Sequence, residues 1–288
     1  TSGYIPNAMA LVASQVPRER SGWALSTLST AQITGVIGGP LLGGFLADHV
    51  GLRMVFYITA FLLLVSFLVT LFLIKEGPRP QFNKGEKLSG KAVFASLPYP
   101  GLVISLFVTT MVIQLCNGSI SPILALFIKS MSPDSGNIAF LSGMIAAVPG
   151  VSALISAPRL GKLGDRIGTA RILLGTLIFA VVLFFAMSFV TTPLQLGILR
   201  FILGFADGAM LPAVQTLLLK YISERVTGRI FGYNQSFMYL GNVVGPLIGA
   251  SVSAMAGFRW VFIVTAVIVL INLWQLALIL RRTQPVRQ

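Results

Sequence analysis

The sequence predicts an all-α integral membrane protein, and composition, hydropathy and segment length support this fold class. Hydrophobic residues make up 55% of the 288 residues and charged residues only 10%, whereas an ordinary soluble domain carries about 25% charged residues. The mean hydropathy is +0.87. The apolar segments are roughly 18 to 25 residues long, which suits membrane-spanning helices and is too long for barrel strands. Because lipid offers no hydrogen-bond partners, each span must satisfy its own backbone as a helix.

The apolar segments predict one partial span, at residues 3–13, followed by complete spans. The complete spans are expected at residues 24–47, 54–74, 101–128, 137–160, 172–190, 194–219, 230–254 and 260–280. A polar linker at residues 75–100 contains Gly77, Pro78 and Pro80, which end the preceding helix.

Lysine and arginine residues concentrate on one side of these spans. The other side holds only Arg53, Lys129 and Arg259, and Arg200 lies within a span. The rich side holds Arg18, Arg20 and the basic residues of segments 75–91, 159–171, 220–229 and 281–287. This positive-inside pattern predicts a cytoplasmic C-terminus. It also accounts for the net charge of +13 without a nucleic-acid partner.

Enzyme chemistry finds no support in the sequence. The single cysteine, Cys116, excludes an internal disulfide and argues against a metal cluster. We find no nucleophile elbow, phosphate-binding glycine loop or metal-ligand spacing, so no cofactor is expected. His49 beside Asp48 is interpreted as part of a solvated loop at a span end.

A glycine-rich stretch, ITGVIGGPLLGG at residues 33–44, recurs as LGNVVGPLIGA at residues 240–250. An offset of 206 residues aligns Pro40 with Pro246 and holds over about 60 residues, which indicates internal duplication.

Six spans separate the copies, so both have the same orientation. The expected organisation is a remnant of a first six-helix half at 1–74 (the end of span 4, then spans 5 and 6), a cytoplasmic linker at 75–100, a complete second half at 101–280 and a cytoplasmic tail at 281–288. Three and a half N-terminal spans would then be missing.

Glycines within these spans predict close helix packing. Gly35, Gly39 and Gly43 recur every four residues on one helix face, where small residues let backbones approach. Their counterparts Gly241, Gly245 and Gly249 should then face lipid or a foreign partner, because the first-half helix they would contact is absent. Pro40 permits a bend. General small-residue packing without a functional bend is the alternative.

The first stretch resembles the antiporter signature of major facilitator transporters, a glycine-rich fifth span ending GPxxGG. The fitting residues are Gly35, Gly39, Pro40, Gly43 and Gly44, with a second-half repeat at Gly241, Gly245, Pro246 and Gly249. Ser26 stands where a further glycine is usual. In that family the signature lies where the halves meet and helps to seal the drug cavity.

A second stretch, GKLGDRIGTAR at residues 161–171, resembles the cytoplasmic loop signature of the same family. The fitting residues are Gly161, Asp165, Arg166 and Gly168, whereas Thr169 and Ala170 replace an expected basic pair. The resemblance to the drug–proton antiporter group implies a twelve-span efflux pump of the bacterial inner membrane with small, lipophilic, chemically varied substrates.

Asp207 is the only one of the eight acidic residues deep within a predicted span. A charge there costs about 3 kcal/mol and marks a functional site by default. Arg200 lies seven residues earlier on the same helix face, about 10 Å away. Low polarity favours the protonated carboxyl and a nearby arginine favours the ionised one, so Asp207 is a candidate for proton coupling. A static hydrogen-bonded aspartate that fixes packing is the alternative.

Amide, aromatic and methionine side chains suggest a permissive substrate cavity. The candidates are Gln114, Asn117, Asn234, Met238 and Asn242. Interhelical hydrogen bonds explain each single residue equally well.

The expected function is multidrug efflux by proton-coupled antiport through alternating access. The expected partners are drugs, protons and the lipid bilayer, together with the missing N-terminal half if it exists as a separate chain. Two alternatives remain, namely a facilitator that imports a defined solute and a non-transporting remnant or interaction module.

Overall fold

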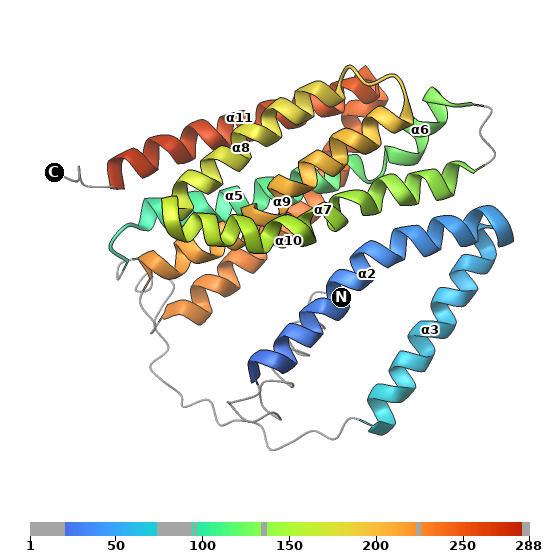
Figure 1. Cartoon of the computed structure of the whole chain (residues 1–288), viewed down its shortest axis with the longest axis horizontal. Helices are drawn as coiled ribbons and strands as arrows, with labels where there is room; N and C mark the ends of the chain where they lie inside the picture. The colour runs from blue at the N-terminus through green and yellow to red at the C-terminus, as the bar shows by residue number, and fades with distance from the viewer. Residues whose placement is uncertain (1–20, 74–93, 95–96, 134–136, 223–225, 284–288) are drawn as a thin grey trace. The chain divides into compact units, whose positions relative to one another are not determined.

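A computed structural model of the chain describes residues 21–73, 94, 97–133, 137–222 and 226–283. The predicted partial span at 3–13, most of the linker and the end of the tail lie outside the described residues. Every regular element within them is a helix, which confirms the all-α fold class (Figure 1).

Seven helices of the described chain are long and apolar enough to cross a membrane. They are α3 (Leu52–Leu73), α5 (Pro100–Ile120), α7 (Ile138–Ile167), α8 (Thr169–Met187), α9 (Pro193–Tyr221), α10 (Thr227–Ala256) and α11 (Phe258–Thr283). They stand where seven of the eight complete spans were predicted. Helix α2 (Ser21–Val50) stands at the eighth position, although it is not one of these seven.

The span predicted at residues 101–128 is wrong in its second part. Helix α5 ends at Ile120, and a separate short helix, α6 (Leu124–Met131), follows after a turn. Pro122 lies in this turn. A proline has no backbone N–H to donate and its ring crowds the preceding turn, so it interrupts a continuous helix.

Helix α7 continues beyond the predicted span end at residue 160. Gly161, Asp165 and Arg166 therefore lie in its last two turns rather than in a loop. Gly168 alone lies in the connection to α8, with a φ of 102° that glycine adopts at little steric cost.

The described chain divides into two compact units, and α7 contributes to both. The first unit contains α2, α3 and residues 138–147 of α7. Within it α2 and α3 diverge from a tight turn (Figure 1, blue and cyan), and the side chains of α3 are almost all exposed.

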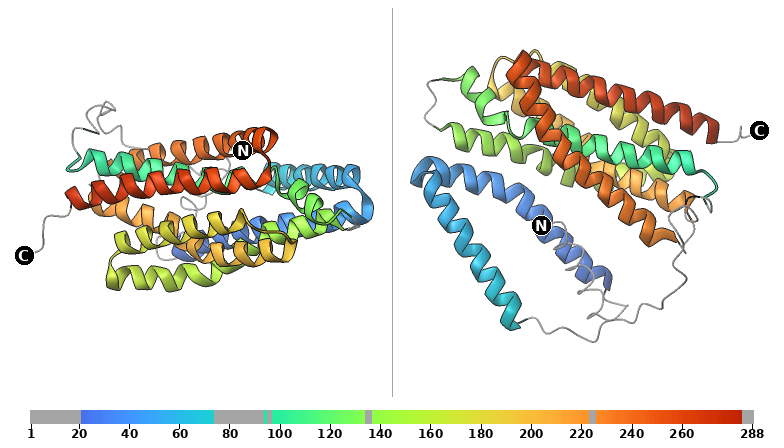
Figure 2. Two further views of the ribbon diagram at one scale, coloured as in Figure 1. Left: turned by 90° about the horizontal axis from the view of Figure 1, so that it is seen from above. Right: turned by 180° about the vertical axis from the view of Figure 1, so that it is seen from behind.

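The second unit contains α5, α6, α8, α9, α10, α11 and the rest of α7. Its long helices run side by side as a bundle (Figure 2). Helix α5 is the most buried of the seven apolar spans, since it packs against α9, α10 and α11.

The duplication is visible in the backbone. Helix α2 begins at Ser21 and α10 at Thr227, an offset of 206 residues that also relates their ends. Gly51 joins α2 to α3 with a φ of 82°, and its counterpart Gly257 joins α10 to α11 with a φ of 94°. The two hairpins are therefore conformational repeats as well as sequence repeats.

The expectation that the α10 glycines face lipid or a foreign partner is wrong. Gly241, Gly245 and Gly249 are buried against α5 within the same unit. A Cβ atom added at Gly241 would clash with the carbonyl of Met111, and one at Gly249 would clash with the carbonyl of Ser119. Helices α10 and α5 thus approach backbone to backbone, and glycine alone fits at this distance.

A methyl group at Gly245 should destabilise the protein. Gly245→Ala would press on the backbone of Leu115 and Gly118, and overpacking of this kind costs about 1–3 kcal/mol. We expect the Tm of the purified chain in detergent to fall by several degrees. The matched control is Gly232→Ala on the same helix, where a Cβ has no described atom within 4 Å, so that variant should be neutral or slightly stabilised. Equal Tm values for the two variants would contradict this account.

Candidate functional site

Helix α9 positions the buried charges of the second unit. Its start is fixed by a capping box, in which Thr192 accepts from the backbone N–H of Gln195 and the Gln195 side chain accepts from that of Thr192. Pro193 occupies the first turn, where its missing N–H costs nothing. Two and four turns further on, this helix carries Arg200 and Asp207 on one face.

Asp207 lies where α5, α8, α9 and α11 meet. Its carboxylate accepts a side-chain hydrogen bond from Asn117 of α5. It also borders a cavity of about 10 Å³ that Cys116, Phe184 and Val269 help to line. A cavity of this size holds about one water molecule. The carboxylate therefore has a polar partner and a small space beside it in an apolar surrounding.

Arg200 is more deeply buried than Asp207. The side chain is 8% exposed, and its Nε and Nη1 atoms have no hydrogen-bond partner among the described residues. Its charge interacts electrostatically with that of Asp207. Burial of a guanidinium without full hydrogen bonding costs free energy. Arg200 is therefore a candidate functional residue and not only a packing residue.

Small residues on α7 and α9 bring these helices close beside Asp207. A Cβ at Gly204 would clash with Ser152, and one at Gly208 would clash with Ser156. Neither glycine was predicted from the sequence to be a contact residue. The signal was available, because glycine at 204 and 208 and serine at 152 and 156 both follow the four-residue spacing of close membrane helix pairs.

The predicted cavity side chains divide between two places. Asn117 turns to Asp207, whereas Gln114 donates from Nε2 to Oδ1 of Asn242 on α10 at 3.3 Å. Asn234 is buried, and its Oδ1 accepts from the hydroxyl of Thr110 at 2.8 Å. Gln114 and Asn242 are thus brought together between α5 and α10.

Met238 stays partly exposed on α10, with the Gln235 amide 3.8 Å from its sulfur. It lies one turn before Asn242 on the same face.

Two further buried polar groups escaped the sequence analysis. Ser105 Oγ on α5 and both amide atoms of Asn272 on α11 have no hydrogen-bond partner among the described residues. Asn272 follows Val269, which borders the Asp207 cavity, by one helical turn. It is the only asparagine of α11, and an amide inside an apolar span is the signal that marks it.

The first glycine motif makes one close contact in the first unit. A Cβ at Gly44 would clash with the carbonyl of Ala139, and one at Gly143 would clash with the carbonyl of Pro40. The predicted row of Gly35, Gly39 and Gly43 differs, because a Cβ at these positions has no described atom within 4 Å.

Asp48 caps the start of α7 and is not a residue of a solvated loop. Its carboxylate oxygens accept from the backbone N–H groups of Ala139 at 3.3 Å and Phe140 at 2.6 Å. These are among the first N–H groups of the helix, which have no intrahelical partner. Phe45 packs edge-on against Phe140 and stacks on His49. His49 is exposed, but it lies in the last turn of α2, so its interpretation as part of a loop was wrong.

The fold and the apolar spans of the described residues define an all-helical, multi-pass membrane protein. The Major Facilitator Superfamily model matches residues 1–171 and again 106–288. The chain belongs to this superfamily, which confirms the resemblance drawn from the two signatures.

Curated relatives share the sequence over nearly the whole chain. The "Multidrug resistance protein MdtG" of Klebsiella pneumoniae (strain 342) is 61% identical over 280 residues, which is 97% of this chain and 68% of that protein. The protein of the same name from Escherichia fergusonii is 61% identical over 271 residues, 94% of this chain and 66% of that protein. The chain therefore spans about two thirds of the length of these relatives.

A solved structure supports the fold alone. It is the inward-facing and occupied form of a bacterial homolog to the human lysosomal transporter Spinster. The similarity has a TM-score of 0.74 at 17% sequence identity, over 97% of this chain and 74% of that chain.

Removal of the Asp48 carboxylate should loosen the start of α7. Loss of a capping side chain costs about 1 kcal/mol, so Asp48→Ala should speed amide hydrogen exchange several-fold at Ala139 and Phe140. Hydrogen–deuterium exchange read by mass spectrometry measures this. His49→Ala is the control, because the His49 ring contacts Phe45 of its own helix. Unchanged protection of α7 in Asp48→Ala would refute the cap.

Proposed function

We propose that this chain forms the larger part of a proton-coupled multidrug efflux transporter of the bacterial inner membrane that works by alternating access. The single observation that carries the proton coupling is Asp207, the one carboxylate at membrane depth in the described spans, with a polar partner and a charged neighbour on its own helix. The substrate class rests on the 61% identity to proteins named for multidrug resistance.

Asp207 has the surroundings that reversible protonation requires. The apolar walls of its cavity favour the neutral carboxyl, whereas Asn117 and the charge of Arg200 favour the carboxylate. A conformational change that alters its distance to Arg200 or opens its cavity would shift this balance. Proton uptake on one side of the membrane and release on the other would then follow the two states of the transporter.

Substrate binding is proposed between α5 and α10. Gln114 and Asn242 supply a donor and an acceptor, and Met238 on the same face supplies an adaptable apolar surface. A few polar groups on a mainly apolar wall suit lipophilic molecules of varied shape.

The proposed orientation places the C-terminus in the cytoplasm. Arg171 at the start of α8 and Arg281 at the end of α11 lie at the same end of the second unit. The basic segments 159–171, 220–229 and 281–287 then share the cytoplasmic side.

Two other functions compete with this proposal. A defined-solute importer of the same fold would need a selective set of polar groups, and the antiporter signature at residues 35–44 favours efflux instead. A non-transporting membrane protein or interaction module is the second alternative. Energy-dependent dye efflux by the 288-residue chain alone, in cells that lack other pumps, would exclude this second alternative.

Neutralisation of Asp207 should uncouple transport. In a chain joined to the N-terminal third of the Klebsiella relative, we expect Asp207→Asn to abolish proton-driven drug efflux in vesicles. Counterflow of labelled drug needs no net proton movement and should be largely retained. Glu224→Gln, a loss of charge in a predicted cytoplasmic loop, is the control and should transport normally. Normal uphill efflux by Asp207→Asn would place the proton site elsewhere.

The open glycine row of α2 should matter only in the longer protein. Gly39 corresponds to Gly245, which is buried on α5, whereas Gly38 corresponds to the branched Val244. In the joined chain we therefore expect Gly39→Val to impair efflux or raise proton leak, and Gly38→Val to be mild.

The 288-residue chain supplies the control for this comparison. There a Cβ atom at either position has no described atom within 4 Å, so we expect neither variant to change the Tm. Equal effects of the two substitutions in the joined chain would mean that the row is not a specialised contact.

A further inference from the structure

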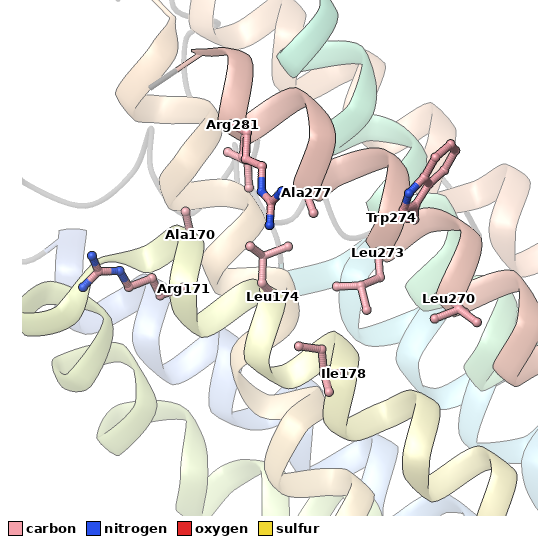
Figure 3. Close-up of a pocket in the computed structure, with 10 residues that line it drawn as sticks. Ala170, Arg171, Leu174, Ile178, Leu270, Leu273, Trp274, Ala277 and Arg281 are labelled. Atoms are coloured by element: carbon pink, nitrogen blue, oxygen red, sulfur yellow. The ribbon is translucent and has the colours of Figure 1, made fainter. Parts of the chain in front are cut away.

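A groove of about 470 Å³ runs between α8 and α11 in the second unit. Figure 3 shows its walls, with Leu174 and Ile178 from α8 facing Leu273 and Ala277 from α11. None of its lining residues borders the Asp207 cavity or belongs to α5 or α10. The groove is therefore separate from the proposed transport site, and it opens between two membrane-spanning helices.

Two arginines stand at one end of this groove. Arg171 lies in the first turn of α8 and Arg281 in the last turn of α11. Figure 3 shows both side chains at the same end, with Leu270 and Ile178 toward the other end. Because this is the end of two apolar spans, the guanidinium groups lie at the depth of lipid headgroups.

The charged side chains of α8 and α11 are all basic. Neither α8 nor α11 contains an acidic residue, and Arg282 follows directly after Arg281. One donor of Arg171, Nη1, contacts the carbonyl of Ile167 at 3.4 Å. A guanidinium carries five N–H donors in a plane that matches phosphate oxygens. A choline or ethanolamine group would find no carboxylate on these two helices, so a net negative headgroup fits best.

We propose that this groove binds one anionic phospholipid, with its phosphate between Arg171 and Arg281 and the first part of one acyl chain along the apolar walls. The walls extend seven residues from Arg171 to Ile178, about 10 Å along the helix. The small side chain of Ala277 lines the groove opposite Leu174. Basic pockets between spans at the membrane surface recognise acidic lipids by this combination of charge and groove.

The test uses the purified 288-residue chain in detergent and native mass spectrometry. Phosphatidylglycerol with 16:0 and 18:1 chains is added at equal concentration to phosphatidylcholine with the same chains. We expect retention of phosphatidylglycerol at least fivefold above that of phosphatidylcholine. The double variant Arg171→Gln/Arg281→Gln should lose this preference. Equal retention of the two lipids by the unaltered chain would overturn the proposal.

The matched control is the double variant Arg159→Gln/Arg282→Gln, which removes the same charge. Arg159 is exposed and contacts the carbonyl of Ile155 as Arg171 contacts that of Ile167, and neither Arg159 nor Arg282 lines the groove. This control should keep the lipid preference. If both double variants lose it equally, general charge attraction and not this groove holds the lipid.

A second comparison tests the acyl chain. Ala277→Phe fills the groove and should reduce phosphatidylglycerol retention, whereas Ala250→Phe on an exposed position of α10 should not. Millimolar glycerol phosphate should not displace the lipid from the unaltered chain. If glycerol phosphate displaces the lipid and Ala277→Phe retains it fully, the site binds phosphate without using the groove. If the unaltered chain shows the mass of a dimer and Ala277→Phe does not, a second copy of the chain occupies the groove. Either result contradicts the proposal.

Photo-crosslinking keeps the proposal testable if a variant proves unstable. Phosphatidylglycerol with a diazirine in its acyl chain should label the unaltered protein at residues 174–178 and 270–277. Even labelling over all exposed spans would count against a bound lipid.

Discussion

The packing of the second unit depends on the distance between the backbones of α5 and α10, and glycines of α10 set this distance. Gly241, Gly245 and Gly249 place α10 directly on the backbone of α5. In lipid there is little hydrophobic drive between helices, so close van der Waals packing of this kind holds them together. Once α5 and α10 are fixed, Gln114 meets Asn242 and Thr110 meets Asn234. Helix α5 then presents its remaining faces to α9 and α11.

Close packing at glycine also positions the buried charges, here between α9 and α7. Gly204 and Gly208 bring α9 against α7 on either side of the turn that carries Asp207. The carboxylate is thus held by rigid packing and a hydrogen bond from Asn117 rather than by a direct contact with Arg200. The Asp207 carboxylate and the Arg200 guanidinium are held apart on one helix. Their electrostatic attraction is strong where water is excluded, so a small change in packing would change this attraction.

Much of the fold was predictable because few backbone structures can span a lipid bilayer. Hydropathy located the spans, and the constant offset predicted a repeat that the turns at Gly51 and Gly257 reproduce. The glycine spacing predicted close packing but not its partner, because a row of small residues defines a distance and not a neighbour. Asp48 could not be interpreted correctly, since the N–H groups that it caps lie about 90 residues later in the chain. The proton and substrate roles stay predictions.

Helices α2 and α10, whose bounds are related by the offset of 206 residues, differ in their surroundings. Helix α10 has its glycine row covered by α5, whereas the row in α2 meets no described atom, and yet both are continuous over 30 residues. Six glycines and a proline make α2 a poor helix by propensity, so its helicity depends on the surrounding medium. In hydrocarbon the backbone N–H groups can be satisfied only by hydrogen bonds within the helix. In water they can instead bond to water molecules. The glycine row of α10 packs on α5, whereas α2 has close contacts with α7 only toward its end. We therefore expect the helicity of α2 to depend more on the lipid than that of α10, and α2 to unwind first on transfer from lipid to water.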